Sequence, residues 1–95
     1  MQALELTRFT LDPAREHELL ATRPQVLARL RKLPGFVEAT LARVDERTWV
    51  DVILWESRAH AEAAIEQAPS IPELAPAFAL PEQLLACEHA DLVAA

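Results

Sequence analysis

The segment RTWVDVILWES, residues 47 to 57, places both tryptophans of the chain close to a carboxylate. Side chains alternate along a β-strand, so we expect Trp49, Asp51 and Trp55 on one face of this segment. A carboxylate between two indoles is either a core group with a charged partner or part of the floor of a ligand pocket. These three residues are therefore candidate substrate-binding residues, and both alternatives stay open.

Arg23 is the charged residue that such a carboxylate could meet. Apolar residues recur between positions 16 and 33 at the spacing of a buried helical stripe, and Arg23 lies on that stripe. A buried guanidinium is costly unless it is paired, so we expect a partner among Asp51, Glu38 and Glu5. The pair either fixes the register of the helix or leaves Arg23 as a catalytic residue that orients an acidic or phenolic substrate.

The elements that position these residues have recognisable ends. Residues 3–11 alternate in the manner of a strand. Asp12 followed by Pro13 is typical of a helix start, because the Asp oxygen caps a free N–H and proline needs no donor there. Pro24 predicts a kink or a break just before it in this helix. Gly35, the only glycine, predicts a left-handed helix cap.

Two strand-like segments flank the polar turn DERT, residues 45–48, so they are expected to form a β-hairpin. A four-residue turn places Glu38 opposite Trp55 and on the same face as Asp51, which makes Glu38 a further candidate for substrate binding. The opposite face of the hairpin is then wholly apolar, with Val37, Ala39, Leu41, Val50, Val52 and Leu54.

A second helix and a last strand complete the expected fold. Ser57 is a suitable cap for a helix that follows it, a short helical turn is expected near residues 73–83, and residues 84–94 suit a strand. The order β-α-β-β-α-β is typical of an α+β, ferredoxin-like fold with a four-stranded antiparallel sheet. Two helices cover one face of that sheet only. The apolar second face predicts a homodimer, and a monomer that exposes this face is the alternative.

Composition limits the function classes. The 95 residues form one domain, 1–95, and 52% of them are hydrophobic. A net charge of −6 provides no basic surface for nucleic acid. The single cysteine, the lack of metal-type cysteine spacing and the absence of an apolar leader or span predict a cytoplasmic protein with no metal and no membrane contact.

The segments ELTRFT, RPQVLARLRKLPGF and TWVDVILWES, followed by an alanine-rich helix, resemble the antibiotic biosynthesis monooxygenase family over nearly the whole chain. The resemblance implies dimeric α+β barrels with a pocket between helices and sheet in each subunit. Family activities include oxidation of polycyclic phenols to quinones without a cofactor, and heme degradation. Trp55 matches a tryptophan of the heme-degrading branch, but Thr7 replaces its asparagine and no histidine matches its iron ligand. No cofactor is therefore expected, and Thr7 is a candidate substrate-binding residue.

Oxidation without a cofactor needs a base that converts a phenol or an activated carbon into an anion able to donate an electron to O₂. His89 is the candidate, because histidine is the only side chain whose ordinary pKa, about 6.5, suits a base near neutral pH. A histidine at the surface or at a dimer contact is the alternative, and Cys87 on the same side of the strand is expected in the core. Two functions remain: a small oxygenase for an aromatic or polyketide-like substrate, or a non-catalytic dimeric module that binds a hydrophobic molecule.

Overall fold

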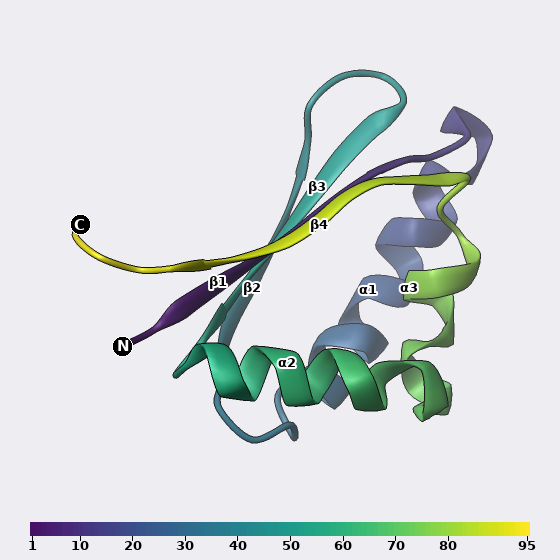
Figure 1. The fold of residues 1–95 in the computed structure, drawn as a ribbon. Helices are drawn as coiled ribbons and strands as arrows, with labels where there is room; N and C mark the ends of the chain where they lie inside the picture. Colours follow the sequence, from purple (N-terminus) through teal and green to yellow (C-terminus); the bar gives the residue numbers. More distant parts are fainter.

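The computed structural model describes residues 1–95 and shows one four-stranded sheet with the helices on one side of it (Figure 1). The main elements are β1 (Ala3–Thr10), α1 (Glu16–Leu30), β2 (Phe36–Arg43), β3 (Thr48–Trp55), α2 (Arg58–Gln67), α3 (Ala75–Ala79) and β4 (Gln83–Asp91). The strands lie in the order β2-β3-β1-β4, and every neighbouring pair is antiparallel. The predicted ferredoxin-like α+β fold is confirmed.

The predicted start of the first helix is confirmed, but its predicted break is wrong. Asp12 Oδ1 accepts a hydrogen bond from the Ala14 N–H at 3.0 Å, and a 3₁₀ turn leads into α1. The helix continues through Pro24, because burial of Leu19, Val26 and Leu30 offsets the cost of an interior proline, about 3 kcal/mol. It ends at Leu30 and not at residue 33.

Gly35 adopts the predicted left-handed backbone, with φ of +80°, but it lies in the turn after α1 and does not cap that helix, whose C-cap is Arg31. A Cβ atom at this position would lie 2.3 Å from Cγ of His60, so only glycine fits against α2. His60 is half-buried, with Nδ1 2.7 Å from the Ser57 hydroxyl. Ser57 caps α2 as predicted, accepting from the His60 N–H.

The β2–β3 hairpin differs from the prediction by one residue of register. Leu41 pairs with Asp51, and Glu38 pairs with Leu54. Asp45 closes a shorter turn than expected, since its Oδ1 accepts from the backbone N–H groups of Arg47 and Thr48. A shift of one residue moves every side chain of β2 to the other face.

This shift corrects three predictions. Glu38 is exposed on the face opposite Asp51, so its assignment to the site is wrong. Ala39 and Leu41 lie on the helix side and pack against the core, so they do not belong to the open face of the sheet. That face carries the half-buried apolar side chains Leu4, Leu6, Val50, Val52 and Leu54.

The core between helices and sheet consists of two clusters. The larger joins Trp55 and Ile53 of β3 to α1 and α2, and the smaller surrounds Trp49 with Phe9, Leu11, Leu19 and Leu80. The two tryptophans of β3 therefore share a face but belong to different packing environments.

None of the helices combines the length and the apolar character that crossing a membrane requires.

Candidate functional site

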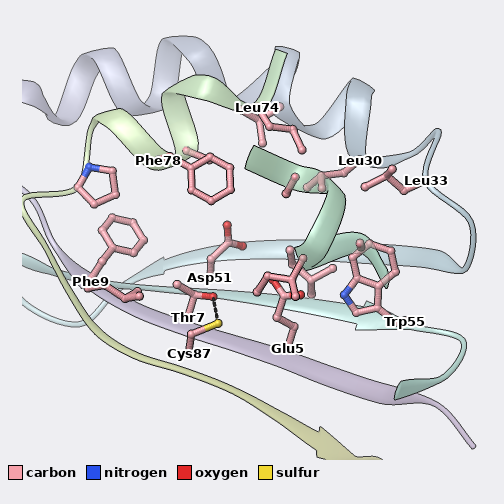
Figure 2. Close-up of a pocket in the computed structure, with 18 of the residues that line it drawn as sticks. Glu5, Thr7, Phe9, Leu30, Leu33, Asp51, Trp55, Leu74, Phe78 and Cys87 are labelled. Atoms are coloured by element: carbon pink, nitrogen blue, oxygen red, sulfur yellow. Dashed lines mark hydrogen bonds between the residues drawn. The ribbon is translucent and has the colours of Figure 1, made fainter. Parts of the chain in front are cut away.

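A cavity of about 460 Å³ lies between the sheet and the helices (Figure 2). Its wall is mainly apolar and includes the aromatic rings of Phe9, Trp55 and Phe78. Its polar lining comes from Glu5, Thr7, Asp51, Glu82 and Cys87. A concave, mostly apolar cavity with a few polar groups is the usual form of a small-molecule site.

Glu5 is the most buried charged residue at this cavity. It lies on the central strand β1, and alternation with Ala3 and Thr7 directs its side chain towards the helices. The side chain is 11% exposed, and one carboxylate oxygen lies 3.6 Å from Nε2 of His89 on β4. Burial raises the pKa of the Glu5 carboxyl above its ordinary value, and the nearby His89 opposes this shift without cancelling it.

Two buried nitrogens beside Glu5 have no hydrogen-bond partner: Nε1 of Trp55 and Nε2 of His89. Trp55 is 1% exposed, and Figure 2 shows its indole nitrogen facing Glu5. The indole N–H faces the Glu5 carboxyl and favours its charged form, as His89 does, so both nitrogens act on Glu5 rather than on the open part of the cavity. His89 pairs with Glu5 across the β1–β4 ladder and is not part of the cavity wall.

Thr7 and Cys87 form a second polar contact at the cavity wall. The Thr7 hydroxyl donates to Sγ of Cys87 at 3.7 Å, which Figure 2 marks with a dashed line. The prediction that Cys87 is a core residue is wrong, because β4 is an exposed edge strand. Thr7, a predicted substrate-binding residue, lies on the cavity wall.

Arg23 and Asp51 form the ion pair that the sequence predicted. The guanidinium of α1 donates two hydrogen bonds to the two carboxylate oxygens of β3, at 2.6 and 2.9 Å. Their side chains are 13% and 18% exposed. Asp51 lines the large cavity, whereas Arg23 lines a neighbouring space of only about 30 Å³.

Trp49 does not reach the large cavity. It packs among Phe9, Leu11 and Leu19 in the smaller core cluster, and the Arg43 guanidinium lies 5.8 Å from its ring centroid. The large cavity therefore contains three of the predicted substrate-binding residues, Thr7, Asp51 and Trp55, and excludes Trp49 and Glu38.

Glu5 is the principal site residue that sequence reasoning treated only as a possible partner of Arg23. The signal for it was present, because Glu5 shares a face of the first strand with Thr7 by simple alternation. Phe78 lies in the five-residue helix α3 and Glu82 in the loop after it, and these segments are too short for periodicity to indicate which side chains turn inward. No three His, Cys, Asp or Glu side chains gather closely enough to form a metal site.

Comparison with known proteins shows relatives of this fold. No protein-family model matches the sequence, and no curated protein matches it either. Among solved structures, SnoaB, a cofactor-independent oxygenase from Streptomyces nogalater, is 26% identical with a TM-score of 0.63, covering 99% of this chain and 93% of SnoaB. Its N63A mutant is 25% identical with a TM-score of 0.67, covering 98% of this chain and 92% of the mutant.

A second neighbour is more alike in structure and less alike in sequence. A protein from Bordetella bronchiseptica that is named as an antibiotic biosynthesis monooxygenase has a TM-score of 0.82 at 18% identity, with 98% of each chain covered. Over its full length the chain therefore has the fold of the antibiotic biosynthesis monooxygenase family, and members of that family, SnoaB among them, are its structural neighbours.

Proposed function

We propose that this protein binds a small hydroxylated aromatic molecule in the large cavity and oxidises it with O₂ without a cofactor. The observation that carries the proposal is the buried Glu5 carboxyl with a raised pKa on the wall of an otherwise apolar cavity of about 460 Å³. A carboxyl in such surroundings is a stronger base than one in water. The full-length likeness to a cofactor-independent oxygenase supports the same reaction class.

The proposed reaction begins with proton transfer from the substrate to Glu5. An anthrone-type substrate has an acidic CH₂ group, and its anion donates one electron to O₂ to give a substrate radical and superoxide. The two combine into a peroxide, which takes up the proton that Glu5 removed. Loss of water then leaves a carbonyl, so that CH₂ and O₂ become C=O and H₂O, a four-electron oxidation balanced by a four-electron reduction.

Other residues have supporting roles in this proposal. His89 is a positioning residue, because it lies beside Glu5 on the neighbouring strand and does not line the cavity. Trp55 directs its N–H at Glu5 and favours the charged carboxylate, and the Thr7 hydroxyl lies on the cavity wall. Arg23 acts by holding Asp51 in place, since both of its terminal nitrogens are already bound to that carboxylate.

The direct test is oxidation of 1,8-dihydroxyanthrone, followed by O₂ uptake and quinone absorbance and corrected for spontaneous oxidation. Wild-type protein should consume one O₂ per quinone, and Glu5→Gln should lose most of the rate, about 10²-fold or more. Glu62→Gln, an exposed change on α2, is the matched control and should keep the rate. Binding of the anthrone without O₂ uptake would contradict the oxygenase and leave a ligand-binding module.

We also propose that a second copy of the chain covers the open face of the sheet. Leu6, Val50 and Val52 lie on that face, which no helix covers. Val52→Lys should dissociate the dimer, because an unpaired charge buried at an interface costs roughly 2 to 5 kcal/mol. Sedimentation should give twice the monomer mass of 10.6 kDa for wild type. A wild-type mass that stays at the monomer value at all concentrations would contradict the dimer.

A further inference from the structure

We infer that the cavity sorts aromatic ligands by charge, accepting cationic and neutral molecules and rejecting anions. This inference deepens the proposed function, whose ligand site it shares, by naming the substrate class. All three charged residues on the cavity wall are acidic: Glu5, Asp51 and Glu82. No lysine, arginine or histidine lines it. A site that recognises an aromatic carboxylate would need a cation or several free donors at the wall.

Arg23, the nearest candidate for anion recognition, does not line the large cavity. Its guanidinium lines the separate space of about 30 Å³ and directs two of its five N–H donors at Asp51. An anion in the cavity would therefore meet the Asp51 carboxylate before it met the arginine. The ion pair reduces the negative charge at Asp51 but leaves its oxygens as the polar atoms at the wall.

Glu5, at the other polar end of the cavity, also disfavours a bound anion. His89 is the only basic side chain among the groups that shift the pKa of Glu5, and it lies beside the carboxyl and off the cavity wall. Trp55 supplies a single neutral donor, which faces Glu5 itself. Acidic groups in a wall of apolar side chains interact strongly with a bound charge, because the effective dielectric constant is low there.

The complementary ligand is thus a cationic or neutral aromatic molecule whose ammonium or hydroxyl donors meet the carboxyl groups of the wall. The net charge of −6 on the chain acts in the same direction as the wall, because it also disfavours the approach of anions.

Titration calorimetry with three naphthalene probes tests this inference at about pH 7.5, where 2-naphthoate is an anion, 2-naphthylmethylammonium a cation and 2-naphthol neutral. The two ions carry the same ring system and opposite charge, so the penalty for removing an ion from water is similar for both. We expect the cation to bind at least about tenfold more tightly than the anion, with 2-naphthol also above the anion.

Variants identify the source of the discrimination. Glu5→Gln should reduce the ratio of cation to anion affinity at least about threefold, whereas Glu62→Gln, which removes the same charge from the exposed side of α2, should leave it unchanged. Glu82→Gln, at an exposed position of the cavity wall, provides a second variant should Glu5→Gln fold poorly.

Three results would overturn the inference: an anion that binds as tightly as the cation, equal effects of the Glu5 and Glu62 variants, or no binding of any probe. None of the probes is an anthrone and the titrations need no O₂. A protein that sorts the naphthalenes but does not oxidise dihydroxyanthrone would therefore retain the charge discrimination and lose the oxygenase assignment.

Discussion

Two pairs of an acidic and a basic side chain lie on the helix-covered face of the sheet, and they differ in how completely the carboxylate oxygens are hydrogen-bonded. Arg23 and Asp51 share two hydrogen bonds of 2.6 and 2.9 Å in a bidentate arrangement. Glu5 and His89 are equally well buried but meet at a single distance of 3.6 Å, and Nε2 of His89 has no hydrogen bond. Both Asp51 oxygens accept a hydrogen bond, so the Arg23–Asp51 pair is called the saturated pair. The Glu5–His89 pair has no hydrogen bond of ordinary length and is called the loose pair.

The contrast indicates which pair can take part in chemistry. The Arg23 guanidinium, held by two charge-assisted hydrogen bonds, fixes the position of α1 over β3. Its interaction with Asp51 is complete without a ligand. The loose pair leaves the Glu5 carboxyl with a raised pKa at the cavity wall, able to gain or lose a proton when a ligand binds. Burial alone does not separate these two cases, because hydrogen-bond geometry is what differs.

Breaking the saturated pair should have the largest effect. Arg23→Ala leaves the buried Asp51 carboxylate without its cation and should reduce the free energy of unfolding by about 3 to 5 kcal/mol. Arg23→Met combined with Asp51→Leu removes both charges and should recover much of that loss. Urea denaturation measures both variants. An Arg23→Ala protein of wild-type stability that had lost ligand binding would instead make Arg23 a functional residue.

The saturated pair was predictable from the sequence because each of its residues lies in an apolar pattern, where a charge requires an oppositely charged partner. Arg23 interrupts an apolar helical stripe, and Asp51 interrupts an apolar strand face, so each position indicates burial and each side chain needs a counter-charge. The element order was predictable for a similar local reason. The caps at Asp12 and Ser57 and the left-handed Gly35 are short-range signals, and all three are confirmed.

The loose pair and the extent of the cavity were not predictable in the same way. His89 meets Glu5 only because β4 pairs with β1 in one particular register, which depends on residues far apart in the sequence. The one-residue error at Glu38 has a local cause, the Asx-type turn at Asp45, which shortens the loop. Alternation alone also treats Trp49 and Trp55 as equivalent, although only Trp55 lines the cavity.

The second prediction concerns the pH dependence that the loose pair should produce. Because burial raises the pKa of Glu5 above its ordinary value of 4.5, the folded protein holds this proton more tightly than the unfolded chain does. The stabilising contribution is complete below pH 4.5 and is lost as the pH rises through the raised native pKa. Glu5→Gln removes this dependence.

Urea denaturation of wild type and Glu5→Gln over a series of pH values measures the effect. The stability of the variant relative to wild type should increase as the pH rises above 4.5, and Glu62→Gln should show no such trend. Parallel profiles for wild type and Glu5→Gln would contradict a raised pKa at this carboxyl.

The third prediction separates His89 from the burial of Glu5. His89 favours the charged carboxylate, so His89→Gln should raise the pKa of Glu5 further. Carbon-13 NMR of the Glu5 side-chain carboxyl measures this pKa directly, with Glu62→Gln as the remote control. An unchanged pKa would show that the imidazole contributes nothing at 3.6 Å and would remove its positioning role.

The smallest effect is expected at Asp45, an exposed carboxylate that contrasts with Glu5 in sign. Hydrogen bonds from the N–H groups of Arg47 and Thr48 lower the pKa of Asp45 below its ordinary value of 3.8. Its contribution is therefore present above pH 3.8 and is lost as the pH falls through the lowered native pKa. Asp45→Ala should flatten only the acid end of the stability profile, while Glu5→Gln changes it only above pH 4.5. Acid-range urea denaturation of both variants checks this separation. Above pH 4.5 Asp45→Ala should differ from wild type by a constant amount, and a different slope of stability against pH in that range would contradict the prediction, because a turn carboxylate held by backbone donors has already lost its proton there.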